Sequence, residues 1–174
     1  MNADALGLSD APQTDKRDLI LQKLQAALAS EKQSEYQYWW GKYTVLGPMF
    51  MSIQKEFADH EEEERAHAEL LAERLYELGG IPVFNPNELH KFADCQYPTY
   101  AGEENQCTMV QLKQQLEAEE CAIQHYEELI ALTADCDPAT NDIIVEILRE
   151  ENEHVKDLKK FIASIELAEG KHKE

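Results

Sequence analysis

The sequence has no long apolar run. Among its 174 residues, no stretch reaches the roughly 18 consecutive apolar residues that a helix needs to cross a bilayer. Residues 1–20 are polar and acidic, without the apolar segment at the centre of a secretory signal peptide. From these two absences we expect a cytoplasmic protein with no membrane partner.

Positive charge is also scarce. The chain has 16 Lys and Arg residues against 35 Asp and Glu residues, a formal net charge of -19. Such a surface repels nucleic acids and attracts cations, so we expect no nucleic-acid partner. Four cysteines are present, but none forms the Cys-x-x-Cys spacing of a zinc or redox pair. On composition alone, we expect buried free thiols in a reducing compartment.

Four long segments have the apolar stripe of an amphipathic helix, and no segment has the pattern of a strand. The first segment starts after Asp15, and the break at residues 47–48 separates it from the second. Residues 79–80, both glycine, end the second helix, and Thr108 is the predicted N-cap of the third. A tight turn at residues 135–138 leads into the fourth.

The connection between the second and third helices, residues 79–107, is much longer than the other two. A short helix is expected near residues 86–93, because proline is tolerated in a first turn. Short connections make antiparallel neighbours, and a long one lets the second hairpin cross the bundle. We therefore predict an all-α antiparallel four-helix bundle over residues 15–168, with a flexible arm over 1–14 and a tail over 169–174.

Two Glu-x-x-His pairs lie on the apolar stripes of the second and fourth helices. They are Glu64 with His67 and Glu151 with His154. Residues three apart share a helix face, so each pair can direct a carboxylate and an imidazole at one point. One such pair alone would indicate a solvated acidic face. Two pairs, both on apolar stripes, indicate the two halves of a dinuclear metal site.

The first and third helices each add a glutamate. Glu31 lies on the first stripe, with Glu35 a weaker alternative. On the third helix Glu120 fits best, because it follows Leu116 by four residues and precedes Ile123 by three. The alternatives there are Glu117, Glu119 and Glu127.

No Lys or Arg shares these stripes, and a buried ionised carboxylate is costly unless it is paired or bound to metal. Two divalent cations would neutralise four carboxylates. Mixed oxygen and nitrogen ligands favour iron or manganese, with zinc as an alternative.

At these residues the chain resembles the ferritin-like superfamily, and bacterioferritin in particular. The similar segments are 29–38, 64–69, 78–82 and 146–154, within a resemblance that covers most of residues 19–165. The resemblance implies two iron ions per subunit, with two terminal carboxylates, two bridging carboxylates and one imidazole for each iron. The implied terminal ligands are Glu31 and Glu120, and the implied bridging ligands are Glu64 and Glu151. The implied imidazole ligands are His67 and His154.

The chain departs from bacterioferritin at three points, which bear on haem binding and on the type of shell. Arg65 stands where bacterioferritin has its haem-binding Met, so no haem is expected. The segment after His154 is too short for the fifth helix that supports the larger ferritin shell. The long second connection is similar to that of Dps proteins, which form dodecamers.

A bacterioferritin-type site in a Dps-like shell describes the Dps-like, or thioferritin, family. That family carries a cysteine pair near its di-iron site, so the resemblance points to Cys95 and Cys121 as a redox pair; two independent buried thiols are the alternative.

The resemblance implies a ferroxidase. It would oxidise Fe(II) with H2O2 or O2 and store Fe(III) mineral in a hollow homo-oligomer, as protection against oxidative stress. One alternative is a di-iron or di-manganese peroxidase or catalase of the same superfamily, without storage. Another is an acidic four-helix interaction protein without metal. Tyr38, seven residues after Glu31 and on the same face, would pack at the core edge or lie near the metals.

Overall fold

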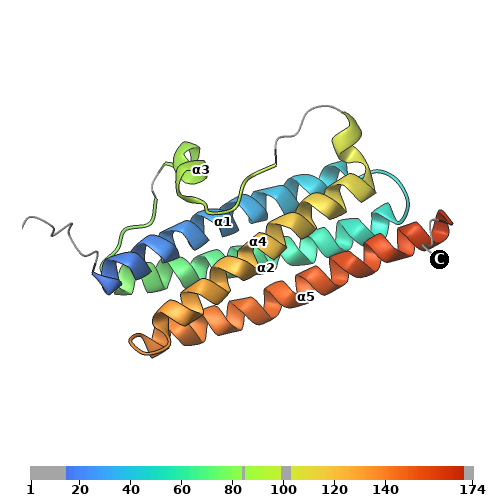
Figure 1. Ribbon diagram of the computed structural model, residues 1–174. Helices are drawn as coiled ribbons and strands as arrows, with labels where there is room; N and C mark the ends of the chain where they lie inside the picture. The colour runs from blue at the N-terminus through green and yellow to red at the C-terminus, as the bar shows by residue number, and fades with distance from the viewer. Residues whose placement is uncertain (1–14, 84, 99–102, 171–174) are drawn as a thin grey trace, which may run out of the picture.

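The computed structural model describes residues 15–83, 85–98 and 103–170, and every named element within them is a helix (Figure 1). The four long helices are α1 (Lys16–Thr44), α2 (Phe50–Glu77), α4 (Thr108–Thr133) and α5 (Pro138–Ala168). In Figure 1, α1 and α2 form one antiparallel hairpin, and α4 and α5 form a second hairpin alongside it. The predicted all-α four-helix bundle is therefore confirmed. The expected arm, residues 1–14, and the end of the tail lie outside the described residues.

The crossover between α2 and α4 carries the expected short helix. It contains the 3-10 helix η1 (Pro86–Glu88), α3 (Leu89–Phe92) and a second 3-10 helix, η2 (Glu103–Gln106). α3 packs on α1, and Figure 1 shows the crossover running along that side of the bundle. In the part of the chain that the structure describes, no helix is both long and apolar enough to cross a bilayer.

Local signals at the helix ends account for most of the boundaries. The side chain of Asp15 caps α1 by accepting from the backbone N–H of Arg17, at 3.3 Å. At the end of α2, Gly79 has a φ of +77°, and Gly80 donates to the carbonyl of Leu75 at 2.9 Å. This is a Schellman motif, which favours glycine at the left-handed position.

The start of α4 differs from the prediction by one residue. Cys107 is the N-cap, and Thr108 is the first helical residue and fully buried. A backbone bridge sets this start: Thr108 N–H donates to the carbonyl of Leu46 at 3.0 Å, and Leu46 N–H donates to that of Gln106. This tertiary contact replaces the side-chain cap that the sequence favoured.

The core consists of two apolar clusters with a layer of buried polar residues between them. The first cluster, at the α4–α5 turn end, includes Leu24, Leu71 and Ile147. The second, at the other end, includes Ile53, Phe57 and Leu158. Along each long helix, the buried glutamates and histidines lie between residues of the two clusters. The bundle therefore holds the polar layer at mid-height, closed off by apolar side chains at both ends.

Candidate metal centre

At the centre of the polar layer, one glutamate from each of the four long helices meets one histidine from each of α2 and α5. Every one of these six side chains is at most 2% exposed. They are Glu31, Glu64, His67, Glu119, Glu151 and His154.

The six side chains form two overlapping groups of four, within each of which the candidate ligand atoms lie within 4.8 Å of one another. In the first group, Nδ1 of His67 is 3.0 Å from Oε1 of Glu151 and 3.4 Å from Oε2 of Glu31. In the second group, Nδ1 of His154 is 3.3 Å from Oε2 of Glu151 and 3.6 Å from Oε1 of Glu119. Glu64 belongs to both groups, with one oxygen 3.6 Å from His67 and the other 3.3 Å from His154.

Glu64 and Glu151 thus present one oxygen to each group, as carboxylates that bridge two cations do. Within the described residues, both oxygens of Glu151 and Nδ1 of both histidines are buried without a hydrogen-bond partner. Such atoms are costly to bury unless something binds them. Three carboxylates and an imidazole in each group suit a divalent ion of the iron or manganese type.

A second set of side chains holds the candidate ligands from outside. The Tyr38 hydroxyl on α1 donates to Glu119 on α4, and the Tyr126 hydroxyl on α4 donates to Glu31 on α1. The exchange is reciprocal, since each hairpin supplies the tyrosine that holds the glutamate of the other.

The histidines are held in the same reciprocal way. Nε2 of His67 on α2 lies 2.7 Å from Glu150 on α5, and Nε2 of His154 on α5 lies 2.8 Å from Glu63 on α2. A carboxylate at the outer nitrogen favours a proton there and turns the inner nitrogen toward the centre. Burial would lower the pKa of both histidines, but the surrounding carboxylates outweigh burial and raise it, so a cation at the inner nitrogen would displace a proton.

The carboxylates of the layer are electrostatically unequal. Burial, together with the neighbouring charges of Glu151 and Glu31, holds the pKa of Glu64 well above its ordinary value of 4.5. Burial and the charge of Glu151 also raise the pKa of Glu119. Burial would raise the pKa of Glu31 as well, but the nearby side chains of Glu64 and His67, with the hydrogen bond from the Tyr126 hydroxyl, outweigh burial and lower that pKa. Four carboxyl groups this close do not all ionise readily without cations between them.

The structure corrects the residue expected on the third helix. Glu120 is exposed and pairs with Lys159 at 2.7 Å, whereas Glu119 is 1% exposed and faces His154. The buried stripe of α4 is largely polar, and a search for apolar periodicity therefore missed it. Its members around the centre are Gln111, Gln115, Glu119, Ala122 and Tyr126.

A sequence signal for Glu119 was available. Tyr38 follows Glu31 by seven residues, and Tyr126 follows Glu119 by the same interval. Matching the two halves by this Glu–Tyr spacing would have selected Glu119 from the alternatives. Of the two locations open for Tyr38, the structure places it beside the centre, fully buried.

His60 is a further buried histidine on α2, four residues before Glu64. Its ring stacks on His154, with centroids 4.0 Å apart, and meets the edge of Tyr38 at 5.0 Å. Burial, with the nearby charge of His154, lowers its pKa to about 4. The equivalent position in the other half, four residues before Glu151, is Ile147. The two halves of the centre are therefore not identical.

The cysteines depart from the expectation of buried free thiols. Cys95 on the crossover and Cys121 on α4 form a disulfide, with Cα atoms 5.9 Å apart. This is the pair to which the family resemblance pointed. Cys107 and Cys136 are free and exposed. The bond closes a loop over a sequence separation of 26, for which the chain-entropy model gives about 3–4 kcal/mol of stabilisation.

Comparison with known proteins gives consistent matches. The model of the ferritin-like domain matches residues 21–168. A DNA protection during starvation protein from Pyrococcus furiosus is 36% identical over 138 residues, which are 78% of this chain and 72% of that protein. A nutrient stress-induced DNA-binding protein from Synechococcus is 31% identical over 159 residues, 90% of this chain and 89% of that protein.

Solved structures agree with the sequence matches. A dodecameric thioferritin, the bacterioferritin-related protein from Bacteroides fragilis, is 36% identical, with a TM-score of 0.85 over 91% of this chain and 92% of its own. Dps from Thermosynechococcus elongatus is 21% identical, with a TM-score of 0.79 over 86% of this chain and 93% of its own, which shows a shared fold.

Proposed function

Because the chain belongs to the ferritin-like superfamily as a Dps-like member, we propose that it is a ferroxidase. It oxidises Fe(II) at the centre inside each subunit and stores the Fe(III) product in a hollow oligomer. One observation carries this proposal. Glu64 and Glu151 each offer one oxygen to both ligand groups, and each group is completed by one further glutamate and one histidine. That arrangement supports two adjacent iron ions per subunit, with Glu31 and Glu119 as the terminal carboxylates.

The proposed reaction takes two Fe(II) ions as substrate and H2O2 as the preferred oxidant, with O2 as the slower one. Two Fe(II) ions give one electron each to H2O2, which takes up two protons and becomes two water molecules. The bridging carboxylates hold the two ions close enough to react together, so no one-electron reduction of H2O2 need occur. Glu63 and Glu150 hold the histidines by their outer nitrogens, so that the inner nitrogens face the ions when the imidazoles give up a proton to bind them.

For assembly we propose a dodecamer, on the basis of the 36%-identical dodecameric protein. The names of two relatives refer to DNA, but the net charge of -19 opposes binding to a polyanion. We therefore propose that this chain protects by removing iron and peroxide and not by covering DNA. An electrophoretic shift of duplex DNA by the purified oligomer, at physiological salt, would contradict this part of the proposal.

The test of the site uses two neighbouring glutamates. Glu119→Gln should slow Fe(II) oxidation by at least tenfold, because losing a ligand should cost no less than the roughly 10–100-fold typical of outer partners. Glu120→Gln, one residue away on the exposed face, should leave the rate unchanged. The measurement is stopped-flow absorbance of Fe(III) after anaerobic Fe(II) loading and mixing with H2O2. Equal oxidation rates in the two variants would contradict the assignment of Glu119 as an iron ligand.

Iron loading distinguishes storage from the alternatives. A storage protein should retain iron well beyond two ions per chain after repeated additions of Fe(II) and H2O2, measured by metal analysis of the purified oligomer. A peroxidase or catalase of the same fold would consume H2O2 while retaining no more than two ions per chain. A purely structural bundle would not accelerate Fe(II) oxidation, and Glu64→Gln with Glu151→Gln would then behave as the parent protein does.

A further inference from the structure

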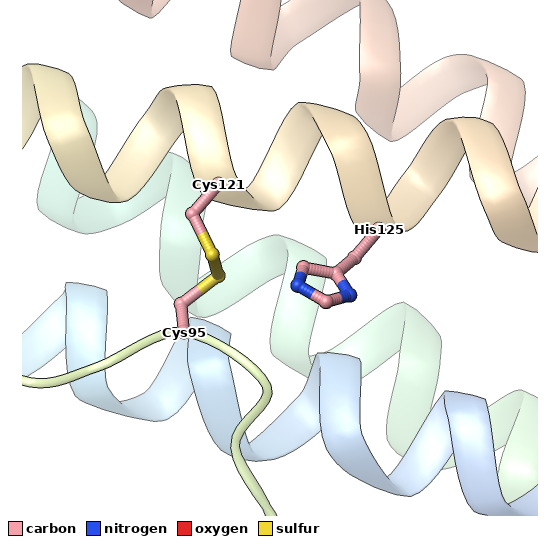
Figure 2. A group of neighbouring side chains, drawn as sticks. All are labelled: Cys95, Cys121 and His125. Carbon is pink, nitrogen blue, oxygen red and sulfur yellow. A yellow bond between two sulfur atoms is a disulfide. The ribbon is translucent and has the colours of Figure 1, made fainter.

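A second group of metal-ligating side chains lies outside the dinuclear centre, between the crossover and α4. It consists of Cys95, Cys121 and His125, each partly buried, with candidate ligand atoms within 4.8 Å of one another. Figure 2 shows the His125 ring beside the disulfide, with one nitrogen turned toward the sulfur atoms. This group contains sulfur, unlike the dinuclear centre, and is therefore suited to a different class of cation.

Helix geometry and the crossover bring the three residues together. Cys121 and His125 are four apart on α4, so their side chains share one face. The crossover places Cys95 opposite that face, with its Cα 5.9 Å from that of Cys121. Reducing the disulfide would leave two thiols and an imidazole at this one position.

The carboxylate of Asp94 lies beside one nitrogen of His125. Its Oδ2 lies 3.0 Å from Nδ1 of His125 and 3.4 Å from the ammonium of Lys23. A carboxylate beside Nδ1 favours the proton there, so the lone pair remains on Nε2, the nitrogen that faces the sulfurs in Figure 2. Histidines that bind metals through one nitrogen usually present the other to a carboxylate in this way.

The group also has access to solvent. A pocket of about 400 Å³ opens beside the disulfide, and its walls include Asp94, Glu117 and both cysteines. The acidic lining attracts cations. The opening leaves room for water as a fourth ligand, which completes the tetrahedral arrangement that zinc prefers.

We propose that, when the Cys95–Cys121 disulfide is reduced, these two cysteines and His125 bind one thiophilic divalent cation of the zinc class. A dithiol supplies two electrons and two protons, so the protein disulfide becomes two thiols and the dithiol becomes a disulfide. Binding of the cation releases both thiol protons to solvent, and two thiolates then neutralise its charge. The sulfur–sulfur bond is replaced by two sulfur–metal bonds, and the crossover stays linked to α4 in both redox states.

The test begins from a variant in which the two exposed free cysteines are replaced, Cys107→Ser with Cys136→Ser. Its disulfide form and its anaerobically reduced form, freed of reductant, are titrated with Co²⁺. The reduced form should bind one Co²⁺ per chain with thiolate-to-cobalt charge-transfer bands, which Zn²⁺ then removes. The disulfide form should show no such bands. The dinuclear centre has no sulfur, so cobalt bound there adds none, and the outcome is independent of the ferroxidase proposal.

Two further variants probe the imidazole while leaving the disulfide able to form, so the oxidised form checks folding by circular dichroism. His125→Ala should weaken Co²⁺ binding at the thiolate site by at least about tenfold, and Asp94→Asn by about 10–100-fold. Absence of charge-transfer bands in the reduced protein would overturn the proposal. An unchanged affinity for Co²⁺ in His125→Ala would show that His125 is not a ligand, and would contradict the proposed three-residue site.

Discussion

The polar layer and the apolar clusters on either side of it are equally buried, but they contribute to the protein in opposite ways. Leu71 in one cluster and Phe57 in the other are inaccessible to solvent, as is Glu151 between them. Burying the apolar side chains stabilises the bundle in proportion to the area removed from water. Burying Glu151 beside three more carboxylates costs free energy until cations occupy the layer. The two ends of the bundle therefore stabilise the fold, and its middle holds the candidate metal ligands.

Removing a large side chain from an apolar cluster should change stability more than any other single substitution considered for this bundle. Phe57→Ala should lower the free energy of unfolding by about 3–5 kcal/mol, because it leaves a cavity in a close-packed cluster. Denaturant unfolding of metal-free protein measures it. The matched change in the polar layer, Glu64→Gln, should not destabilise the metal-free protein. A loss of similar size in Glu64→Gln would show that the two regions stabilise the fold alike.

Bound cations should offset the free energy that it costs to bury the carboxylates of the polar layer. Under anaerobic conditions, Fe(II) at about 100 times its dissociation constant should add about 2.7 kcal/mol per site to the stability of the folded protein. Thermal unfolding with and without Fe(II) gives the shift. The combination of Glu64→Gln with Glu151→Gln should abolish it. A shift that persists in that double variant would place the stabilising iron elsewhere.

The outer carboxylates should have a smaller effect. Glu150→Gln removes the partner of Nε2 of His67 and should weaken metal binding by about 10–100-fold, or about 1.4–2.7 kcal/mol. Calorimetric titration with a redox-inert divalent cation measures the loss. Glu153→Gln, on the exposed face of the same helix, is the control. Equal affinities in both variants would show that Glu150 does not position His67.

The stability of the metal-free protein should also depend on pH, with a smaller change than those above. The pKa of Glu64 in the folded protein is raised above 4.5, so the folded state binds its proton more tightly than the unfolded state does. This group's contribution is therefore fully present below the unfolded pKa and is lost as pH rises through the folded value. Metal-free protein should lose stability as pH rises above 4.5, less steeply in Glu64→Gln. Identical stability profiles against pH would contradict a raised pKa.

Much of this molecule could be predicted from local sequence. The four amphipathic stripes, the cap at Asp15 and the glycines after α2 locate the helices, because each depends on residues within a few positions. The two Glu-x-x-His pairs were found because they interrupt otherwise apolar stripes. The start of α4 was displaced by one residue because a backbone bridge to Leu46, distant in sequence, determines it.

The sequence by itself therefore determined the helices, their order, and five of the six side chains now found at the centre of the polar layer. Apolar periodicity favoured Glu120, and the tertiary structure buried Glu119 instead, which in the sequence is marked only by the Glu–Tyr spacing shared by the two halves. Adjacent helical residues differ by about 100° in direction, and on α4 the buried face carries too many polar residues for periodicity to identify it. The structure also joined Cys95 to Cys121 and brought His125 and Asp94 beside them. That arrangement depends on how a long crossover folds back on the bundle, and no local pattern encodes it.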